Sequence, residues 1–307
     1  MGFLEFLEQS IELKMMGKKI NILLLLAFAM FVTSCRKKEI KTVNDYNKGE
    51  ISILTDDSFK SVTEALADAY MINYPETKVN VKVQKEDLAL MDLLKGNSKL
   101  IVMSRDLTPE EISEYKRITD LDYRQDKFAA DAVLFIVPKS SARRSISVEE
   151  VKQMLNSDNK NLIFDGTNAS NLNFVAQKLG KKPEQLKYSI ISGNENVVAQ
   201  LSKFPDKIGV VSLNTLSRPY GKNAELLRDL VKILPVEDKG KVFEPSGDNL
   251  RQMQYPFTRI LYFLNNEGNF QIANGIIRFS CTQLGQMVVE KEGLQPYNIF
   301  KREVQMR

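Results

Sequence analysis

The chain has 307 residues, of which 43% are hydrophobic and 27% charged, and its formal net charge is +4. This composition is typical of a soluble globular protein long enough for two domains. The mild basic excess, without a concentrated basic stripe, argues against nucleic-acid binding. Histidine is absent, which excludes Ser-His-Asp and Cys-His catalysis and most zinc sites. The sequence has no phosphate loop and no calcium loop, so we expect no enzyme, no metal ion and no cofactor.

The first part of the chain indicates an export signal. A pair of lysines precedes the apolar residues 20–32, and small residues follow before Cys35. This pattern is typical of a secretory signal, and its apolar core is shorter than the about 20 residues that a bilayer-spanning helix needs. We expect residues 1–34 to be removed, with residues 1–14 an over-called start because three glutamates lie where a signal is basic. The alternative is an uncleaved membrane anchor with an incidental cysteine.

The residues that end at Cys35 resemble the lipobox of bacterial lipoproteins, in which the cysteine is acylated. This resemblance implies lipidation of Cys35 and a lipid-anchored protein on the periplasmic side of a bacterial membrane. Cys281 would then have no disulfide partner. It lies in an apolar-periodic segment and is expected to be a small buried hydrophobe.

Strands and helices alternate from residue 50 onward. Residues 35–49 are polar and without periodicity, which predicts a tether. Beyond them, segments with alternating apolar residues are followed by segments with helical apolar spacing. The predicted strands cover residues 51–54, 78–84 and 99–103, and the predicted helices cover residues 62–74, 88–94 and a segment that begins at Thr108.

A second set of elements follows the most apolar stretch, residues 128–138. Strands are predicted at residues 161–164, 207–213 and 255–263, and helices at residues 170–179, 194–202, 270–279 and 282–291, with another that begins at Ser147. Alternating strands and helices favour an α/β fold with parallel pairing. We expect lobe 1 at residues 50–132, lobe 2 at residues 133–254 and a return to lobe 1 at residues 255–307. The two long apolar strands would connect the lobes.

Polar side chains follow several predicted strands where the next helix begins. In open α/β sheets, ligands bind at the carboxyl ends of the strands, and helix N-termini offer free N–H groups that suit oxyanions. Arg105 would add a forked, permanently charged donor. Ser, Asp and Asn are also ordinary N-caps, and this structural interpretation stays open. The candidate ligand-binding residues are Asp57, Ser58 and Phe59 after the first strand, Ser104 and Arg105 after a later strand, and Ser170 and Asn171 in the second lobe.

Asp131 is a further candidate, because it lies within the apolar residues 128–138. A buried carboxylate costs several kcal/mol unless it is paired or hydrogen-bonded. It is expected either to be a structural partner of Arg105 or of backbone amides, or to accept a proton-bearing oxygen from a ligand.

The order of these motifs resembles that of the substrate-binding lipoproteins of phosphate-type ABC importers. The resemblance implies a periplasmic-binding-protein fold, in which two lobes, each a sheet flanked by helices and joined by two hinge strands, close over the ligand. It also implies a monomer that binds a small oxyanion, phosphate first, and an ABC transporter permease as partner. The matching segments are residues 57–60, 74–76, 103–107 with 110–111, 129–132 with 136–139, 207–210, 255–259, and 285–286 with 293–296. By position, the residues that would contact the oxyanion are Ser58, Phe59, Ser104, Arg105, Ser170 and Asn171, with Asp131 at the hinge.

The chain departs from this family at residues 163–171, which lack the arginine and the Ser-Gly-Thr that phosphate binders often carry. Arg105 is expected to compensate, so Arg105→Ala should abolish oxyanion binding with little loss of fold. Asp57 and Asp131 would repel sulfate, whereas monoprotonated phosphate can donate a hydrogen bond, which favours phosphate. Because a positive charge is missing, a ligand-free scaffold or sensor protein with a degenerate cleft stays open. A hydrolase with Asp57 or Ser58 as nucleophile is a third alternative.

Overall fold

The computed structural model describes residues 45–299. The chain divides into two units, Met1–Val43 and Asn44–Arg307, and the described residues belong to the second. The predicted signal, the lipidated Cys35 and most of the predicted tether lie outside the described residues. None of the helices within residues 45–299 has the length and apolar character that a membrane span requires.

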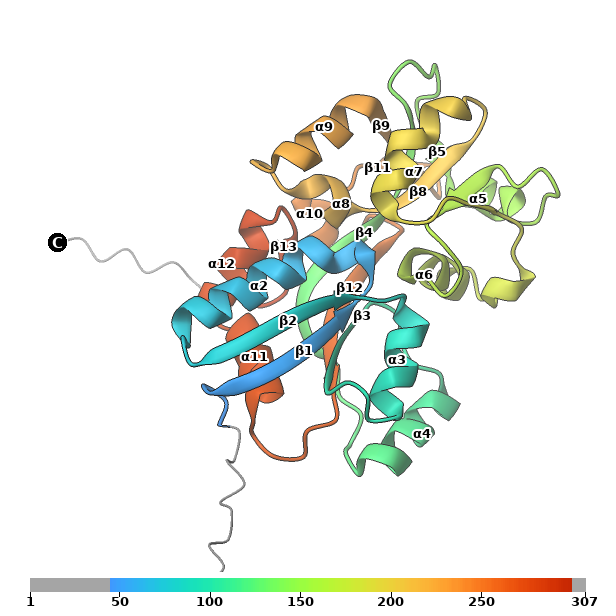
Figure 1. The fold of residues 1–307 in the computed structure, drawn as a ribbon. Helices are drawn as coiled ribbons and strands as arrows, with labels where there is room; N and C mark the ends of the chain where they lie inside the picture. The colour runs from blue at the N-terminus through green and yellow to red at the C-terminus, as the bar shows by residue number, and fades with distance from the viewer. Residues whose placement is uncertain (1–44, 300–307) are drawn as a thin grey trace, which may run out of the picture. The chain divides into compact units, whose positions relative to one another are not determined.

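Three parallel strands form the first half of the sheet. β1 (Gly49–Thr55) lies between β2 (Thr77–Val83) and β3 (Leu100–Met103) and is parallel to both. Helices cover the two sides of these strands, with α3 and α4 on one side and α2, α11 and α12 on the other (Figure 1). The helices of this half are η1 (Asp57–Phe59), α2 (Lys60–Asn73), α3 (Glu86–Leu94), α4 (Pro109–Thr119), α11 (Ile272–Ser280) and α12 (Gln283–Lys291).

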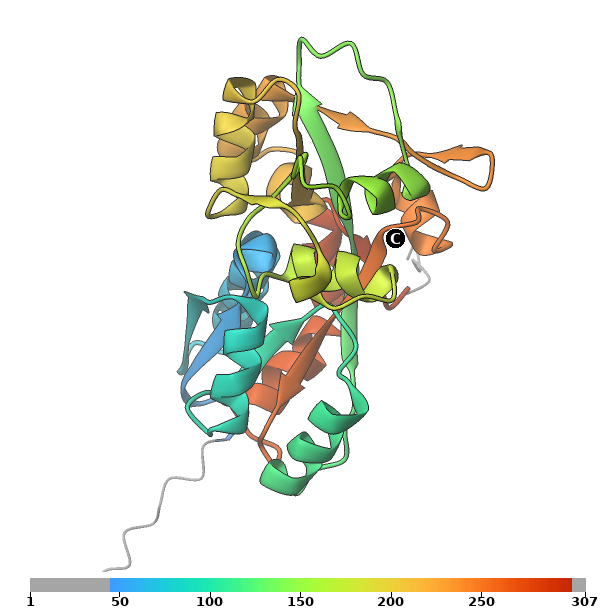
Figure 2. The same cartoon turned by 90° about the vertical axis from the view of Figure 1, so that its right-hand side faces the viewer.

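One long strand, β4 (Asp126–Pro138), runs through both halves of the sheet (Figure 2). Its first part pairs antiparallel with β12 (Thr258–Asn265), and its second part pairs antiparallel with β8 (Ile208–Ser212). The partner changes between Ala132 and Val133. The short strand β13 (Gln295–Pro296) also pairs with the first part of β4.

We call residues 45–132 and 258–299 lobe 1, and residues 133–257 lobe 2. In lobe 2, β8 pairs in parallel with β6, and β6 pairs in parallel with β7. The strands of lobe 2 are β5 (Ile146–Ser147), β6 (Leu162–Phe164), β7 (Ser189–Ile190), β8, β9 (Val231–Leu234), β10 (Val236–Asp238) and β11 (Lys241–Phe243), and its helices are α5 (Val148–Met154), α6 (Ser170–Lys178), η2 (Pro183–Gln185), α7 (Asn194–Gln200), η3 (Leu201–Lys203), α8 (Leu213–Ser217), α9 (Lys222–Leu230) and α10 (Gly247–Arg251).

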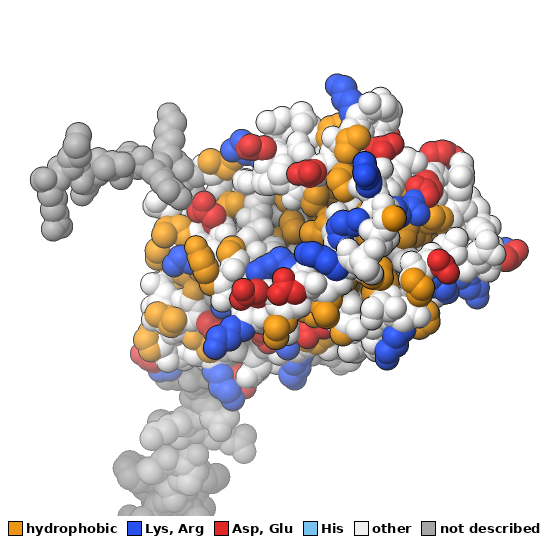
Figure 3. All heavy atoms as spheres, turned by 90° about the horizontal axis from the view of Figure 1, so that it is seen from above, with side chains coloured by type: hydrophobic (Ala, Val, Ile, Leu, Met, Phe, Trp, Pro, Cys, Tyr) orange, Lys and Arg blue, Asp and Glu red, His pale blue; other side chains and the backbone are white. Residues whose placement is uncertain are grey.

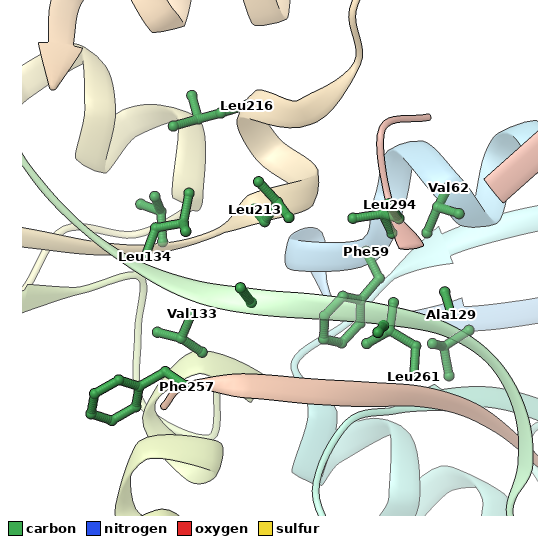
Figure 4. Packing of buried hydrophobic residues seen from close by; sticks show 14 of the residues in the cluster. Phe59, Val62, Ala129, Val133, Leu134, Leu213, Leu216, Phe257, Leu261 and Leu294 are labelled. Carbon is green, nitrogen blue, oxygen red and sulfur yellow. The ribbon is translucent and has the colours of Figure 1, made fainter. Parts of the chain in front are cut away.

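A hydrophobic cluster extends along β4 through both lobes. In Figure 4, Phe59 and Ala129 lie toward one end of this cluster and Leu134 and Phe257 toward the other. Cys281, which the sequence predicted to be buried, packs against the cluster but is only half-buried, as a free thiol at the end of α11. The shared core brings the loop after β1 close to the start of α8, at the middle of the molecule.

Charges of both signs are mixed over the face shown in Figure 3. Blue lysine and arginine side chains alternate there with red aspartate and glutamate side chains. No broad area of one sign gathers on this face.

Candidate functional site

The loop after β1 places the carboxylate of Asp56 at the boundary between the lobes. The side chain is fully buried. Its Oδ1 accepts a hydrogen bond from the amide of Ser58 at 3.0 Å, and its Oδ2 accepts from the amides of Glu86 and Ser170, each at 3.2 Å. Burial raises the pKa of Asp56 above its usual range, although the positive charge of Lys85 opposes that rise. The carboxylate therefore joins the starts of η1, α3 and α6.

Asp57 and Lys85 make a second connection between the lobes. Asp57 Oδ2 accepts hydrogen bonds from the backbone and side-chain amides of Asn194, at 2.8 and 2.9 Å. Asp57 Oδ1 contacts the ammonium of Lys85, which lies 2.7 Å from Asp165 Oδ2. Burial alone would raise the pKa of Asp57, but Lys85 and Asn194 hold it below its usual range. Burial and the repulsion from Asp56 raise the pKa of Asp165 to about 6.

The three carboxylates of Asp56, Asp57 and Asp165 lie close enough together to hold a metal ion, since their ligand atoms are within 4.8 Å of one another. The ammonium of Lys85 already supplies a positive charge between two of them. Burial disfavours that charge, but the attraction of the three carboxylates raises the pKa of Lys85 above its usual value. We therefore assign no metal to this cluster.

Arg259 and Asp131 form a fully buried ion pair across β12 and β4, where they lie opposite each other in the strand register. The Nε and Nη2 of Arg259 each lie 2.8 Å from Asp131 Oδ2. Nη2 also donates to Asn171 Oδ1 at 2.9 Å, and the guanidinium carbon lies 4.6 Å from the centroid of the Phe59 ring. Arg259 thus touches both lobes from β12.

Five buried side-chain atoms within residues 45–299 lack a hydrogen-bond partner. They are Ser170 Oγ, Asn173 Oδ1, Asn214 Nδ2, Thr215 Oγ1 and Arg259 Nη1. All but Thr215 belong to residues that make hydrogen bonds across the two lobes through other atoms. Two of the five atoms can only donate, the two hydroxyls can donate or accept, and the Asn173 oxygen only accepts. The boundary between the lobes therefore has an excess of free donors.

Arg105 and Ser104 contact carboxylates of lobe 1. Ser104 donates to Glu86 Oε1 from its amide at 2.6 Å and from its hydroxyl at 2.8 Å. The Nη2 of Arg105 lies 2.8 Å from Asp87 Oδ1 and 2.8 Å from Glu111 Oε1. These contacts connect α3 to the start of α4, and the guanidinium of Arg105 is therefore already paired with two carboxylates. Its expected contact with an oxyanion stays a prediction.

Six of the eight candidate residues belong to the connected group of side chains between the lobes. Ser104 and Arg105 connect to this group through Glu86. The backbone amide of Glu86 donates a hydrogen bond to Asp56. The six residues in the group are Asp57, Ser58, Phe59, Asp131, Ser170 and Asn171.

Five further members of this group were not predicted from the sequence: Asp56, Lys85, Asp165, Asn194 and Arg259. Asp165 directly follows the predicted strand 161–164, so the strand-end rule that selected Asp57 could have found it. Arg259 is a charge within an apolar strand, which is the signal that selected Asp131. Lys85 and Asn194 carry no comparable signal.

Comparison with known proteins assigns the fold. Residues 42–282 match a family model described as the PBP superfamily domain. The phosphate-binding protein PstS of Borreliella burgdorferi is 23% identical over 297 residues, which cover 90% of this chain and 98% of the relative. This agrees with the resemblance inferred from the motifs.

Two solved structures have the same fold. One, from Clostridium perfringens, is named as a candidate phosphate ABC transporter substrate-binding protein with bound phosphate. It has a TM-score of 0.66 at 19% identity, over 81% of this chain and 99% of its own. An ABC-type phosphate transport receptor from Vibrio cholerae has a TM-score of 0.60 at 16% identity, over 81% of this chain and all of its own. The expected α/β periplasmic-binding-protein fold is confirmed at this level, and these relatives are binding proteins rather than enzymes.

Proposed function

This chain belongs to the PBP superfamily, and we propose that it is an extracytoplasmic solute-binding lipoprotein that captures phosphate or a related oxyanion for an ABC importer. The ligand would lie between the lobes, beside Arg259 and Ser170, and the protein would deliver it unchanged to a transporter permease. Lipidation of Cys35 and a place on the periplasmic side of a bacterial membrane belong to the same proposal.

The observation that carries this proposal is the unpartnered Nη1 of Arg259. Buried polar groups are normally hydrogen-bonded, and leaving a buried donor unsatisfied costs about 1–3 kcal/mol. An oxyanion beside Nη1 would remove that cost through a charge-assisted hydrogen bond. The free donors Ser170 Oγ and Asn214 Nδ2 would add further hydrogen bonds to the same ligand.

Arg259 also supplies the positive charge that residues 163–171 lack. Its guanidinium comes from β12 and reaches lobe 2 through its hydrogen bond to Asn171. A positive charge is thus present between the lobes although the middle region supplies none. Arg259, rather than Arg105, is the residue that we assign to the oxyanion.

Nearby carboxylates would select a protonated ligand. Asp57 and Asp131 both belong to the connected group between the lobes and would repel a fully ionised sulfate. Monoprotonated phosphate can donate a hydrogen bond to one of them, and a site built to accept such a hydrogen bond rejects a ligand that lacks it. We therefore expect phosphate to bind at least about tenfold more tightly than sulfate, a difference of about 1.4 kcal/mol.

Calorimetric titration of the purified protein with phosphate and with sulfate at pH 7 tests this proposal. Asp57→Asn removes one negative charge that repels sulfate. The ratio of the phosphate affinity to the sulfate affinity should therefore fall in this variant. Absence of heat and of thermal stabilisation with either anion would contradict the proposal. Equal affinities in the wild type would contradict the proposed selectivity.

One observation favours a second function, that of a scaffold or sensor with a degenerate cleft. Asp56, Asp57 and Lys85 already make hydrogen bonds and an ion pair between the lobes, in the region where a ligand would bind. A thermal-shift screen with phosphate, sulfate, molybdate and phosphonates separates the two functions, because any ligand that binds only the folded state raises its stability. Stabilisation by none of these anions would favour the scaffold.

A further inference from the structure

The carboxylate of Asp56 accepts hydrogen bonds from the backbone amides of Ser58 and Ser170, two residues that the motif order predicted to contact an oxyanion. Oδ1 accepts a hydrogen bond from the amide of Ser58, and Oδ2 accepts one from the amide of Ser170. The amide of Phe59 donates to the main-chain carbonyl of Asp56 at 2.9 Å. A buried carboxylate has the charge and the paired acceptor oxygens of an oxyanion, so an internal group already fills the place of one.

This carboxylate also bridges the two lobes with a single oxygen. Oδ2 accepts from Glu86 in lobe 1 and from Ser170 in lobe 2, both at 3.2 Å. Beside it, Asp57 accepts from Asn194 of lobe 2, and Lys85 contacts Asp165 of lobe 2. Three charged residues of lobe 1, Asp56, Asp57 and Lys85, therefore contact lobe 2 directly.

We propose that Asp56 is an internal substitute for the solute, whose carboxylate keeps the lobes together before any oxyanion enters and which the oxyanion must displace. The first half of this inference concerns the ligand-free protein and stands independently. The second half, displacement by an oxyanion, rests on the proposed function.

Two consequences follow from the competition. The ligand-free protein should keep its lobes in contact, and loss of the Asp56 carboxylate should let the lobes move apart by a hinge motion. The apparent affinity for the solute is reduced by the fraction of molecules in which Asp56 has left its amides. Removing the Asp56 carboxylate should therefore open the ligand-free protein and tighten phosphate binding, by at least about tenfold where the internal contact is populated in nine molecules of ten.

Asp56→Asn separates the two roles of the side chain. Its amide oxygen can still accept from Ser58 at the start of η1, which preserves the N-cap. Its Nδ2 would face the N–H groups of Glu86 and Ser170 and cannot accept from them. Asp122→Asn is the matched control, since Asp122 is an almost fully exposed carboxylate of the same lobe.

Small-angle X-ray scattering in phosphate-free buffer tests the first half. Wild type and Asp122→Asn should give the same small radius of gyration, and Asp56→Asn a larger one with an unchanged circular dichroism spectrum. Equal radii of gyration for the ligand-free wild type and Asp56→Asn would overturn the inference. Should Asp56→Asn fail to fold, Asp56→Ser keeps a hydroxyl for the Ser58 amide but is too short to reach all three amides, and the same comparison applies.

Addition of phosphate tests the second half. Phosphate should reduce the radius of gyration of Asp56→Asn to the wild-type value and bind this variant more tightly than the wild type. If the wild type binds phosphate and the variant binds no more tightly, the competition is refuted. If neither protein binds phosphate while the variant is expanded, the proposed function fails and the internal role of Asp56 stands.

Discussion

Arg259 and Asp131 show how two charges can be buried in the apolar centre of this molecule. Antiparallel pairing of β12 with β4 places them directly opposite each other, and the ion pair is completed by Asn171 on one side and by the Asn214 amide on the other. Removing one member would leave an uncompensated buried charge, which costs about 3–5 kcal/mol.

The sequence identified Asp131 as a buried charge that needs a partner, and the expected backbone amide is confirmed by Asn214. The expected arginine was wrong, because the partner is Arg259 rather than Arg105. Chain order cannot distinguish two arginines that both lie beside apolar strands. Strand register decides between them, and register depends on contacts between segments far apart in the sequence.

Asp165 should make the folded state less stable as the pH rises. Its pKa of about 6 exceeds the about 3.9 of an unfolded aspartate, so between these values the folded state binds more protons than the unfolded state. Stability contributed by this group is present below pH 4 and is lost as the pH rises through 6. In Asp165→Asn this contribution is absent, so the free energy of unfolding of the variant minus that of the wild type should increase from pH 4 to pH 7.

Urea unfolding at several pH values measures this difference. Asp206→Asn, an exposed carboxylate of the same lobe, is the control and should follow the wild type at every pH. A parallel pH profile for Asp165→Asn and wild type would show that Asp165 titrates normally.

At the scale of elements, strongly periodic segments were predicted well. The predicted helices 170–179 and 282–291 correspond to α6 (Ser170–Lys178) and α12 (Gln283–Lys291). No element was predicted between residues 214 and 254, where the structure has α9, β9 and the β10–β11 hairpin. α9 has buried Ala224 and Leu227 at helical spacing and could have been predicted. The strands β9, β10 and β11 are three or four residues long and partly exposed, so their apolar residues form no clear period. Their pairing with β4 and β5 stabilises them, which is a tertiary effect.

The close approach of α11 and α12 depends on Gly285. A Cβ at this position would lie 2.4 Å from the carbonyl oxygen of Phe279 and 2.6 Å from the Cα of Ser280. Because these are backbone atoms, Gly285→Ala must displace one helix, and overpacking of this kind costs about 1–3 kcal/mol. We expect a lower melting temperature by calorimetry for Gly285→Ala. The neighbouring exposed Gln283→Ala should stay within about 0.5 kcal/mol of the wild type, and equal stability of the two variants would refute the close approach.

At the scale of the molecule, β4 explains why the candidate site lies between the lobes. β4 pairs with β12 in lobe 1 and with β8 in lobe 2, so residues near its middle meet loops from both. The apolar residues 128–138 predicted the long strand that the structure shows as β4, while the predicted lobe boundaries and the pair of connecting strands stay predictions. Among the polar side chains that cross the boundary, Asp165 follows a predicted strand and could have been found by the strand-end rule. Lys85 and Asn194 could not, because each has the sequence context of an ordinary helix start or loop.

We propose that Arg259, and not Arg105, binds an oxyanion between the lobes. Calorimetric titration of phosphate into Arg259→Lys and Arg105→Lys tests it, since lysine keeps the charge in both variants but loses the forked guanidinium. We predict that Arg259→Lys weakens phosphate binding by about tenfold or more, a loss of about 1.4 kcal/mol, while Arg105→Lys lowers the melting temperature and leaves the dissociation constant unchanged. Unchanged phosphate affinity in Arg259→Lys, together with its loss in Arg105→Lys, would contradict the claim.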